Sequence, residues 1–236
     1  MIKKIKFAES NFFIDDDNYE NFWNITKTWE RDISKFINKN FREDCIFIDI
    51  GAWIGPYTLL ASSLNMKVYA FEPDPIAFNS LKKNVELNKF KYQPILYNYG
   101  LSKEDKKTIL YSNSKEFGNS ESSLIGYKNE ENLKKTEIKT KNFNEELDEI
   151  KKNNQDLKIA MMKIDIEGGE FFIEEDIYNF VKKNDIFCIL SYHHLVFNSN
   201  KLIKFLRKLK TKYLQLFVKK IYPSKRLFKI AEIFSS

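Results

Sequence analysis

Five short apolar runs, separated by segments with helical signals, constrain the fold of this 236-residue chain more than any other feature. Runs of this length without polar alternation are typical of strands buried on both faces, and strands that alternate with helices form a mostly parallel sheet with right-handed crossovers. The sequence therefore predicts an α/β fold. The runs are CIFIDI (45–50), KVYAFE (67–72), QPILYNYG (93–100), KIAMMKIDI (158–166) and IFCILSYHH (186–194).

Helix signals fill the intervals between these runs. PYTLLASSLN (56–65) follows the first run, and DPIAFNSLKKNVELN (74–88) begins with Asp74 as N-cap and Pro75 at the first helical position. NEELDEIKKNN (144–154) precedes the fourth run, and a loop followed by a helix leads from it to the fifth. Because no linker or internal repeat divides the chain, we expect a single domain.

The two ends of the chain add further elements. Apolar residues over 19–38 recur every three or four positions, which predicts a helix. We therefore expect residues 1–44 to form a helical extension that could act as a lid, and residues 45–236 to form the main domain. The segments 212–220 and 226–234 resemble a closing strand pair, which predicts a terminal β-hairpin.

Between the third and fourth runs lies a polar stretch, residues 102–135, with one short strand signal, TILY (108–111), and a turn rich in Gly, Ser and Asn. A long polar connection in a compact domain is typical of an insertion or an active-site loop. We expect this stretch, like the N-terminal extension, to border the substrate.

Composition indicates a globular, non-membrane chain. Hydrophobic residues make up 43% and charged residues 31%, with no run of about 18 apolar residues. The N-terminus lacks the features of a secretory signal, and Cys45 and Cys188 sit in apolar runs as expected of buried free thiols. We therefore expect a cytoplasmic location.

The net charge of +6 is unevenly distributed. Residues 201–236 hold 11 Lys and Arg against one acid, whereas the rest of the chain holds 28 basic and 32 acidic residues. Three interpretations of this basic end remain open: a solvated surface, attraction to nucleotide- or lipid-linked anionic substrates, and peripheral association with the inner membrane surface through the amphipathic LIKFLRKLK. Nucleic acid is not expected, because no RNA-binding module accompanies the charge.

Chemically versatile residues follow the ends of the predicted strands, where open α/β sheets bind ligands. Gly51 and Gly55 bracket a strand-to-helix turn, and Glu72 ends the next strand 21 residues beyond Gly51. That spacing suits a backbone turn against a ligand and a carboxylate on a ribose diol. The loop GAWIGPY lacks the third glycine of a dinucleotide fingerprint, which argues against NAD.

Three motifs in order, IDIGAWIGPYT, VYAFEPDPIAFNSLKKNVELN and KIDIEGGE, resemble the FkbM family of S-adenosylmethionine-dependent methyltransferases, and FGNSESSL (117–124) is similar to a glycine-to-serine loop of that family. The resemblance runs from about residue 45 to 195. It implies a single-domain class I (Rossmann-like) methyltransferase with a mostly parallel seven-stranded sheet. The implied cofactor is S-adenosylmethionine.

The resemblance also assigns the cofactor site. Asp49, Gly51 and Gly55 would face the methionine part, Glu72 would bind the ribose hydroxyls, and the end of the third strand would border adenine. The residues implied to bind the cofactor are Asp49, Gly51, Ala52, Trp53, Gly55, Glu72, Pro73, Tyr99, Gly100 and Asp165.

The chain departs from the family pattern at three places. Trp53 stands where a small polar residue is common, and Pro56 where an aromatic residue is usual. Ser191 stands two residues before His193, where the family often has an acid, which puts in doubt a mechanism that needs a carboxylate there. Trp53 is therefore either a wall against cofactor or acceptor or plain packing beneath the loop.

An acceptor hydroxyl needs a base near neutral pH. The candidate catalytic residues are His193, which aligns with the family's histidine, His194, Asp165 and Glu167; Glu170 could instead belong to the first turn of the following helix. Neighbouring strand residues point in opposite directions, so one histidine at most is expected to reach the site, and either could be structural. Asp165, Glu167 and a histidine could alternatively bind a divalent ion, but no fixed ligand spacing supports a metal.

The resemblance thus implies O-methylation of a carbohydrate hydroxyl in surface glycan biosynthesis, such as capsule or lipopolysaccharide. The acceptor would be a small-molecule sugar or a nucleotide- or lipid-linked sugar. Two alternatives stay open: N- or O-methylation of another small metabolite or natural-product intermediate, and a non-catalytic cofactor-binding protein. The sequence does not predict the oligomeric state.

Overall fold

The computed structural model describes residues 1–17, 19–25, 30–112, 118, 122–124, 134–193, 214–220 and 226–229. For residues 192–193, 214–220 and 226–229 the description is of the backbone.

Five parallel strands form the centre of the main sheet, in the order β11-β10-β3-β4-β5. They are β3 (Ile46–Ile50), β4 (Lys67–Phe71), β5 (Ile95–Tyr97), β10 (Ile159–Ile164) and β11 (Phe187–His193). The strand order reverses direction at β3, because the chain first adds strands on one side of it and then on the other. The prediction of an α/β fold with a parallel sheet is confirmed.

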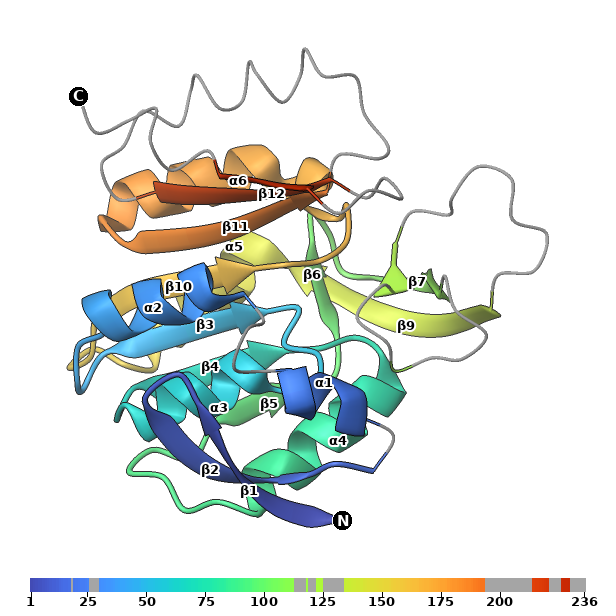
Figure 1. Cartoon of the computed structure of the whole chain (residues 1–236). Helices are drawn as coiled ribbons and strands as arrows, with labels where there is room; N and C mark the ends of the chain where they lie inside the picture. Colours follow the sequence, from blue (N-terminus) through green and yellow to red (C-terminus); the bar gives the residue numbers. More distant parts are fainter. Residues whose placement is uncertain are drawn as a thin grey trace.

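Two C-terminal strands continue the order beyond β11 (Figure 1). β12 (Leu214–Lys220) runs parallel to β11, and β13 (Arg226–Lys229) runs antiparallel to β12. They lie where the sequence predicts a closing strand pair. The amphipathic segment LIKFLRKLK falls outside the described residues.

Helices cover both faces of the sheet. α3 (Pro56–Ser63) and α4 (Pro75–Glu86) lie on one face, and α5 (Phe143–Lys152) and α6 (Glu170–Asn184) pack on the other. The carboxylate of Asp74 caps α4 by accepting hydrogen bonds from the amides at positions 76 and 77, which confirms its N-cap role.

Alternate residues of a central strand enter separate hydrophobic cores. Ile46, Ile48 and Ile50 of β3 pack with α5 and α6, whereas Phe47 between them packs with α3 and α4. All four side chains are at most 1% exposed. This two-sided burial explains why the strands read as continuous apolar runs in the sequence.

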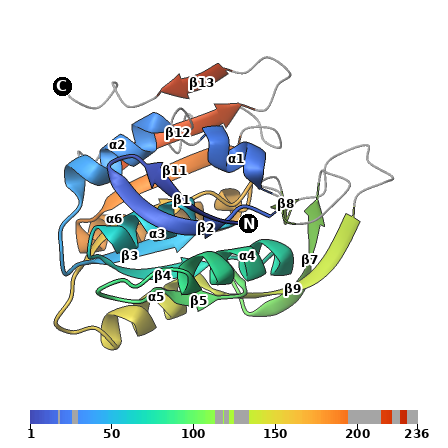
Figure 2. The same ribbon diagram turned by 60° about the horizontal axis from the view of Figure 1, so that its bottom comes forward.

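The sequence predicts a helical N-terminal extension, but the structure also contains strands there. It begins with a β-hairpin of β1 (Ile2–Phe7) and β2 (Ser10–Asp15), which precedes α1 (Glu20–Ile25) and α2 (Arg31–Asn40). The single helix predicted over 19–38 is two helices, because Glu30 adopts a left-handed backbone conformation, with φ of 41°, immediately before α2. Figure 2 shows the hairpin and both helices on the α3–α4 side of the sheet.

Two asparagines of the α4 region attach the hairpin to the domain. Asn88 accepts a hydrogen bond from the amide of Phe13 and donates one to its carbonyl, at 2.8 and 2.7 Å. Asn84 accepts from the amide of Asp15 at 2.7 Å and donates to the carbonyl of Ile54. The two side-chain amides thus pair with β2 as a neighbouring strand would.

The polar insertion is built around a second sheet, of four strands in the order β6-β9-β7-β8. Its strands are β6 (Gly100–Ser102), β7 (Lys106–Ser112), β8 (Ser122–Ser123) and β9 (Lys134–Asn142). The predicted strand over 93–100 is therefore divided: β5 ends at Tyr97, and Gly100 begins a strand of the second sheet. Figure 1 shows β7 and β9 projecting beyond the end of the main sheet.

Candidate active site

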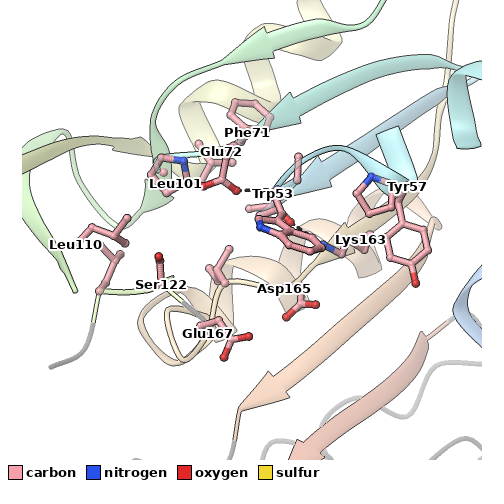
Figure 3. Close-up of a pocket in the computed structure, with 18 of the residues that line it drawn as sticks. Trp53, Tyr57, Phe71, Glu72, Leu101, Leu110, Ser122, Lys163, Asp165 and Glu167 are labelled. Carbon is pink, nitrogen blue, oxygen red and sulfur yellow. Dashed lines mark hydrogen bonds between the residues drawn. The ribbon is translucent and has the colours of Figure 1, made fainter. Parts of the chain in front are cut away.

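A cavity lies at the carboxyl ends of β3, β4 and β10, bordered by the insertion and the N-terminal segment (Figure 3). We call its two sides the strand-end side and the extension wall. The strand-end side comprises Gly51, Ala52, Trp53, Glu72, Pro73, Asp165, Ile166 and Glu167. The extension wall comprises Phe22, Glu30, Leu110, Ser122 and Leu124.

The turn after β3 requires glycine at position 51. Gly51 has φ of +77°, and a Cβ there would lie 1.9 Å from the carbonyl oxygen of Asp165. The amides of Gly51 and Ala52 both donate to the carbonyl of Phe71, at 2.9 and 3.0 Å. Gly51 therefore allows the backbones that follow β3 and β10 to meet at the edge of the cavity.

Glu72 lies at the end of β4 with its carboxylate on this turn. Its two oxygens accept hydrogen bonds from the amides of Trp53 and Asp74, both at 2.8 Å. Burial raises the pKa of Glu72 to about 7, although the two backbone donors act to lower it. The carboxyl group therefore changes its protonation state near neutral pH at the edge of the cavity.

A buried ion pair between Lys163 and Asp49 lies beneath the turn. Lys163 is among the residues that line the cavity, and Asp49 is not. Thr58 donates to Asp49 at 2.7 Å, and the Lys163 ammonium lies 3.5 Å from the other oxygen of Asp49. Lys163 also donates to the carbonyl of Gly51 at 2.7 Å. Burial is the largest influence on the pKa of Lys163 and lowers it, but the surrounding carboxylates, Asp49 first, raise it overall. Lys163 thus fixes the turn as a cation.

Asp165 and Glu167 follow β10 and face the cavity on the side of Trp53 opposite Glu72 (Figure 3). Glu167 has φ of +49° and is 6% exposed, and its carbonyl accepts a hydrogen bond from the Ser123 hydroxyl. Glu170 is fully buried and accepts from the amides of Ile166 and Gly168, so it stabilises the turn. The two cavity carboxylates are thereby placed on a loop that is fastened at both ends.

Trp53 connects the strand-end side to the other parts of the cavity. It adopts φ of +52°, and its indole N–H donates to the carbonyl of Gly118 at 2.8 Å. Its ring packs edge-on against Phe22 and Tyr19, with centroid distances of 4.6 and 5.7 Å. Figure 3 shows the indole between Glu72 and Asp165. Trp53 therefore lines the cavity and packs against the N-terminal segment, and its contact with cofactor or acceptor stays a prediction.

Gly118 is the point where the insertion meets the N-terminal segment. Its carbonyl accepts from Tyr19 as well as Trp53, and its amide donates to Asp74 at 2.8 Å. The Ser122 hydroxyl donates to the same Asp74 oxygen. The α4 N-cap thus also holds the insertion beside the cavity, a role that its sequence context does not reveal.

Tyr57 and Glu30 form a second contact between the domain and the N-terminal segment. The Tyr57 hydroxyl donates to Glu30 at 2.8 Å, and both residues line the cavity. Burial raises the pKa of Tyr57 well above its usual range, and the neighbouring carboxylates, Glu30 first, raise it further. Neither residue was singled out by the sequence, because their spacing of 27 positions follows no local pattern.

Most of the residues that the resemblance implies for the cofactor gather at the cavity. Those that line it are Gly51, Ala52, Trp53, Glu72, Pro73, Gly100 and Asp165. Asp49, Gly55 and Tyr99 are not among the lining residues. Asp49 lies beneath the turn, Gly55 begins α3 in a left-handed conformation, and the Tyr99 hydroxyl donates to Glu146 of α5 at 2.7 Å.

Of the two predicted histidines, the structure describes only the backbone of His193. The backbone of His193 ends β11, three residues beyond the point where Leu190 aligns with Ile164 of β10. His193 therefore lies at the same end of the sheet as Asp165, the carboxyl end of the parallel strands. His194 lies outside the described residues.

Among the described residues, three carboxylates close enough to share a metal ion occur at Asp15, Asp16 and Asp17. They form ion pairs with the amino group of Met1, and Asp16 also pairs with Lys3. None of them lines the cavity. No helix in the described ranges has the length and apolarity needed to cross a membrane.

The fold is a parallel α/β domain with a cavity at the point where the strand order reverses. The model of the FkbM methyltransferase domain matches residues 49–212, so the chain belongs to the FkbM family. It is an S-adenosylmethionine-dependent methyltransferase domain, and S-adenosylmethionine is its cofactor.

No curated protein matches the chain. Among solved structures, it is similar to a SAM-dependent methyltransferase from Agrobacterium tumefaciens, with 7% identity, a TM-score of 0.48, and coverage of 97% of this chain and 67% of that chain.

Proposed function

We propose that this methyltransferase methylates a carbohydrate hydroxyl in the biosynthesis of a surface glycan. The observation that carries the proposal is the pair of carboxylates, Asp165 and Glu167, across Trp53 from Glu72. Carboxylates accept hydrogen bonds from sugar hydroxyls and can take up the proton that a hydroxyl releases on methylation. Family membership supports the methyl transfer, and the cavity chemistry supports the hydroxyl acceptor.

We assign the part of the strand-end side that follows β3 and β4 to the cofactor. Glu72 would accept hydrogen bonds from the ribose hydroxyls, and Gly51, Ala52 and Trp53 would present backbone to the methionine part. Pro73 and Gly100 would border the adenine, with Tyr99 behind them. Asp49 and Gly55 would act by shaping the turn. The positive φ at Gly51 and the partly protonated Glu72 fit a ligand held by backbone and a single carboxylate.

When bound, S-adenosylmethionine supplies an activated methyl group on a sulfonium. The chain's own contribution is to hold the acceptor oxygen in line with that methyl and to exclude water, which accounts for much of the rate in such displacements. Trp53 and Phe22 supply an apolar wall for this purpose. Asp165, Glu167, His193 and His194 remain the candidates for the base that takes the acceptor proton.

Calorimetry with S-adenosylmethionine tests the cofactor assignment. Glu72→Ala should weaken binding at least about tenfold, because a desolvated carboxylate that binds two hydroxyls is lost. Glu86→Ala, at the exposed end of α4, is the matched control. Equal binding by both variants would reject the assignment.

Turnover tests the base. Asp165→Asn and His193→Ala should be compared with the parent chain at saturating cofactor, with methylated product detected by mass. Replacement of the residue that acts as the base should lower kcat at least about a hundredfold and leave cofactor binding unchanged. A residue whose replacement leaves kcat intact is not the base.

A second candidate function is methylation of an amine or hydroxyl on another small metabolite, since carboxylates also bind amines.

We further propose a cytoplasmic location, supported by the free thiols of Cys45 and Cys188. We propose that β12 and β13 complete a seven-stranded sheet of the class I type, and that residues 1–44 are an extension of a domain spanning 45–236. The basic C-terminal region would provide any association with the inner membrane surface.

A further inference from the structure

Gly118 is held at both of its backbone polar groups by two residues that also hold Glu72. The indole of Trp53 donates to the Gly118 carbonyl, and the Gly118 amide donates to the Asp74 carboxylate, both at 2.8 Å. The amides of the same two residues, Trp53 and Asp74, donate to separate oxygens of Glu72, also at 2.8 Å. These contacts form a closed cycle of four hydrogen bonds, which joins Glu72 to Gly118 by two routes.

The packing around Gly118 leaves it little room to move. Its φ is +92°, and a Cβ there would lie 2.7 Å from the hydroxyl oxygen of Tyr19 and 2.8 Å from the side chain of Ile76. The Tyr19 hydroxyl also donates to the Gly118 carbonyl, at 2.9 Å. The position of Gly118 is therefore set from three sides, and a shift in its two hydrogen-bond partners cannot be absorbed by empty space.

Asp74 uses its two carboxylate oxygens for different tasks. One oxygen accepts from the amides at positions 76 and 77 and caps α4. The other accepts from the Gly118 amide and from the Ser122 hydroxyl, at 2.8 and 3.2 Å. Because an N-cap needs only one oxygen, the second is available to the insertion. A side chain with a single acceptor oxygen could serve only one of the two tasks.

The cycle also joins the two sides of the cavity. Glu72 belongs to the strand-end side and Ser122 to the extension wall. Asp74, which is 1% exposed, contacts both: its amide donates to Glu72 and its carboxylate accepts from Ser122. In a network of buried hydrogen bonds, whatever fixes one member also restrains its neighbours. The orientation of Glu72 and the position of the wall at Ser122 therefore depend on the same contacts.

We propose that Asp74 and Gly118 are positioning residues that couple the two sides of the cavity, so that a cofactor bound at Glu72 also fixes Gly118 and the wall at Ser122. The inference rests on the proposed assignment of Glu72 to the cofactor and deepens it. Because such coupling is reciprocal, a fixed Gly118 in turn raises the affinity for the cofactor. The acceptor side is then complete only when S-adenosylmethionine is bound, so the cofactor adds before the acceptor.

Hydrogen exchange of the Gly118 amide measures the coupling in the parent chain. The chain contains one Phe–Gly pair, at positions 117 and 118, so isotope labelling of Phe carbonyls and Gly amides isolates this signal by NMR. Saturating S-adenosylmethionine should slow the exchange at least about tenfold. An unchanged exchange rate with the cofactor bound would overturn the inference and leave the cofactor assignment standing. Cofactor affinity that Glu72→Ala does not alter would overturn both.

Asp74→Asn separates the coupling from the cap. Asparagine caps helices as well as aspartate does, so α4 is retained, but its single acceptor oxygen cannot also serve Gly118. The affinity for S-adenosylmethionine, measured by calorimetry, should fall at least about fivefold, and the cofactor should no longer slow the exchange of the Gly118 amide. Asp148→Asn, at an exposed position of α5, is the matched control and should behave like the parent. Parent-like affinity in Asp74→Asn would show that Asp74 only caps α4.

The direction of the change distinguishes coupling from a simple charge effect. Burial is the largest cause that raises the pKa of Glu72, and the negative charge of Asp74 raises it further. Loss of that charge alone would leave Glu72 more fully ionised and a stronger acceptor for hydroxyls, so the affinity would rise. A higher affinity in Asp74→Asn would therefore contradict the proposal. The exchange measurement on the parent chain decides the question even if this variant does not fold.

Discussion

The two sides of the cavity differ in how they are built. The strand-end side comes from residues directly after adjacent parallel strands, and its contacts join backbone to backbone or to a buried carboxylate, as at Gly51 and Glu72. The extension wall comes from segments distant in sequence, and side chains such as Trp53 and Tyr19 connect it to one carbonyl, that of Gly118. The first side depends on backbone geometry and the second on side-chain packing. Replacements on the two sides should therefore have effects of different size and kind.

The largest effect is expected at Gly51. Gly51→Val places a β-branched side chain at positive φ and against the Asp165 carbonyl, so the free energy of unfolding should fall by about 3 kcal/mol or more. Denaturant unfolding measures this change in the free energy of unfolding. Gly100→Ala is the control, because a Cβ there meets neighbours no closer than 3.6 Å, and it should change the free energy of unfolding by less than about 1 kcal/mol. Similar losses at both positions would refute the special role of the turn.

The next effect concerns the ionisation of Glu72. Its pKa of about 7 in the folded chain exceeds the usual 4.5, so the folded state retains a proton that the unfolded state has released. Between pH 4.5 and 7 this group therefore makes the free energy of unfolding decrease as pH rises, by at most about 3 kcal/mol in total. Glu72→Gln should lack this contribution, so its stability relative to the parent should improve from pH 5 to pH 8. Parallel pH profiles for the two proteins would show that Glu72 is not perturbed.

A smaller effect is expected at Trp53, where the strand-end side meets the N-terminal segment and the insertion. Trp53→Phe keeps an aromatic ring against Phe22 but loses the hydrogen bond to Gly118, so stability should fall by about 1 kcal/mol. Binding of S-adenosylmethionine should change less than about threefold, because the amide of Trp53 still donates to Glu72. Calorimetry measures the affinity of the variant for S-adenosylmethionine. A tenfold loss of cofactor affinity in the folded variant would mean that the indole itself binds the cofactor.

The smallest effect is expected for Tyr19→Phe, which removes the other hydrogen bond to the same carbonyl. While Trp53 still donates, the loss should be about 0.5 kcal/mol. The double variant with Trp53→Phe leaves the Gly118 carbonyl without both donors, so its loss should exceed the sum of the single losses by about 0.5 kcal/mol or more. Simple additivity would show that the two contacts are independent.

The same difference explains what the sequence could predict. Gly51, Glu72 and the Asp74 cap follow from local patterns, because each depends on residues within one strand-turn-helix unit or on the adjacent strand. Glu30 and Gly118 depend on contacts across 27 and 65 positions, which no periodicity encodes. They could be found only once the fold had brought the segments together.

Two errors in the predicted fold have physical reasons of the same kind. The hairpin of β1 and β2 has alternating burial, but its lysine-rich exposed face hid the pattern within a polar stretch. Strand β9, Lys134–Asn142, is stabilised by pairing with β7 and β6, and its charged residues alone favour a loop. In both cases tertiary pairing outweighed local propensity.

The asparagine contacts of the hairpin decide how far this chain could be shortened. The matched region begins at residue 49, inside β3, so a chain trimmed to this family boundary would have to begin just before β3. Removing the hairpin would leave the side-chain amides of Asn84 and Asn88 without their β2 partners and would uncover apolar helix surface that Phe12 and Ile14 now cover. A chain trimmed to the family boundary should therefore aggregate, and the smallest unit worth producing for biochemistry starts ahead of the hairpin.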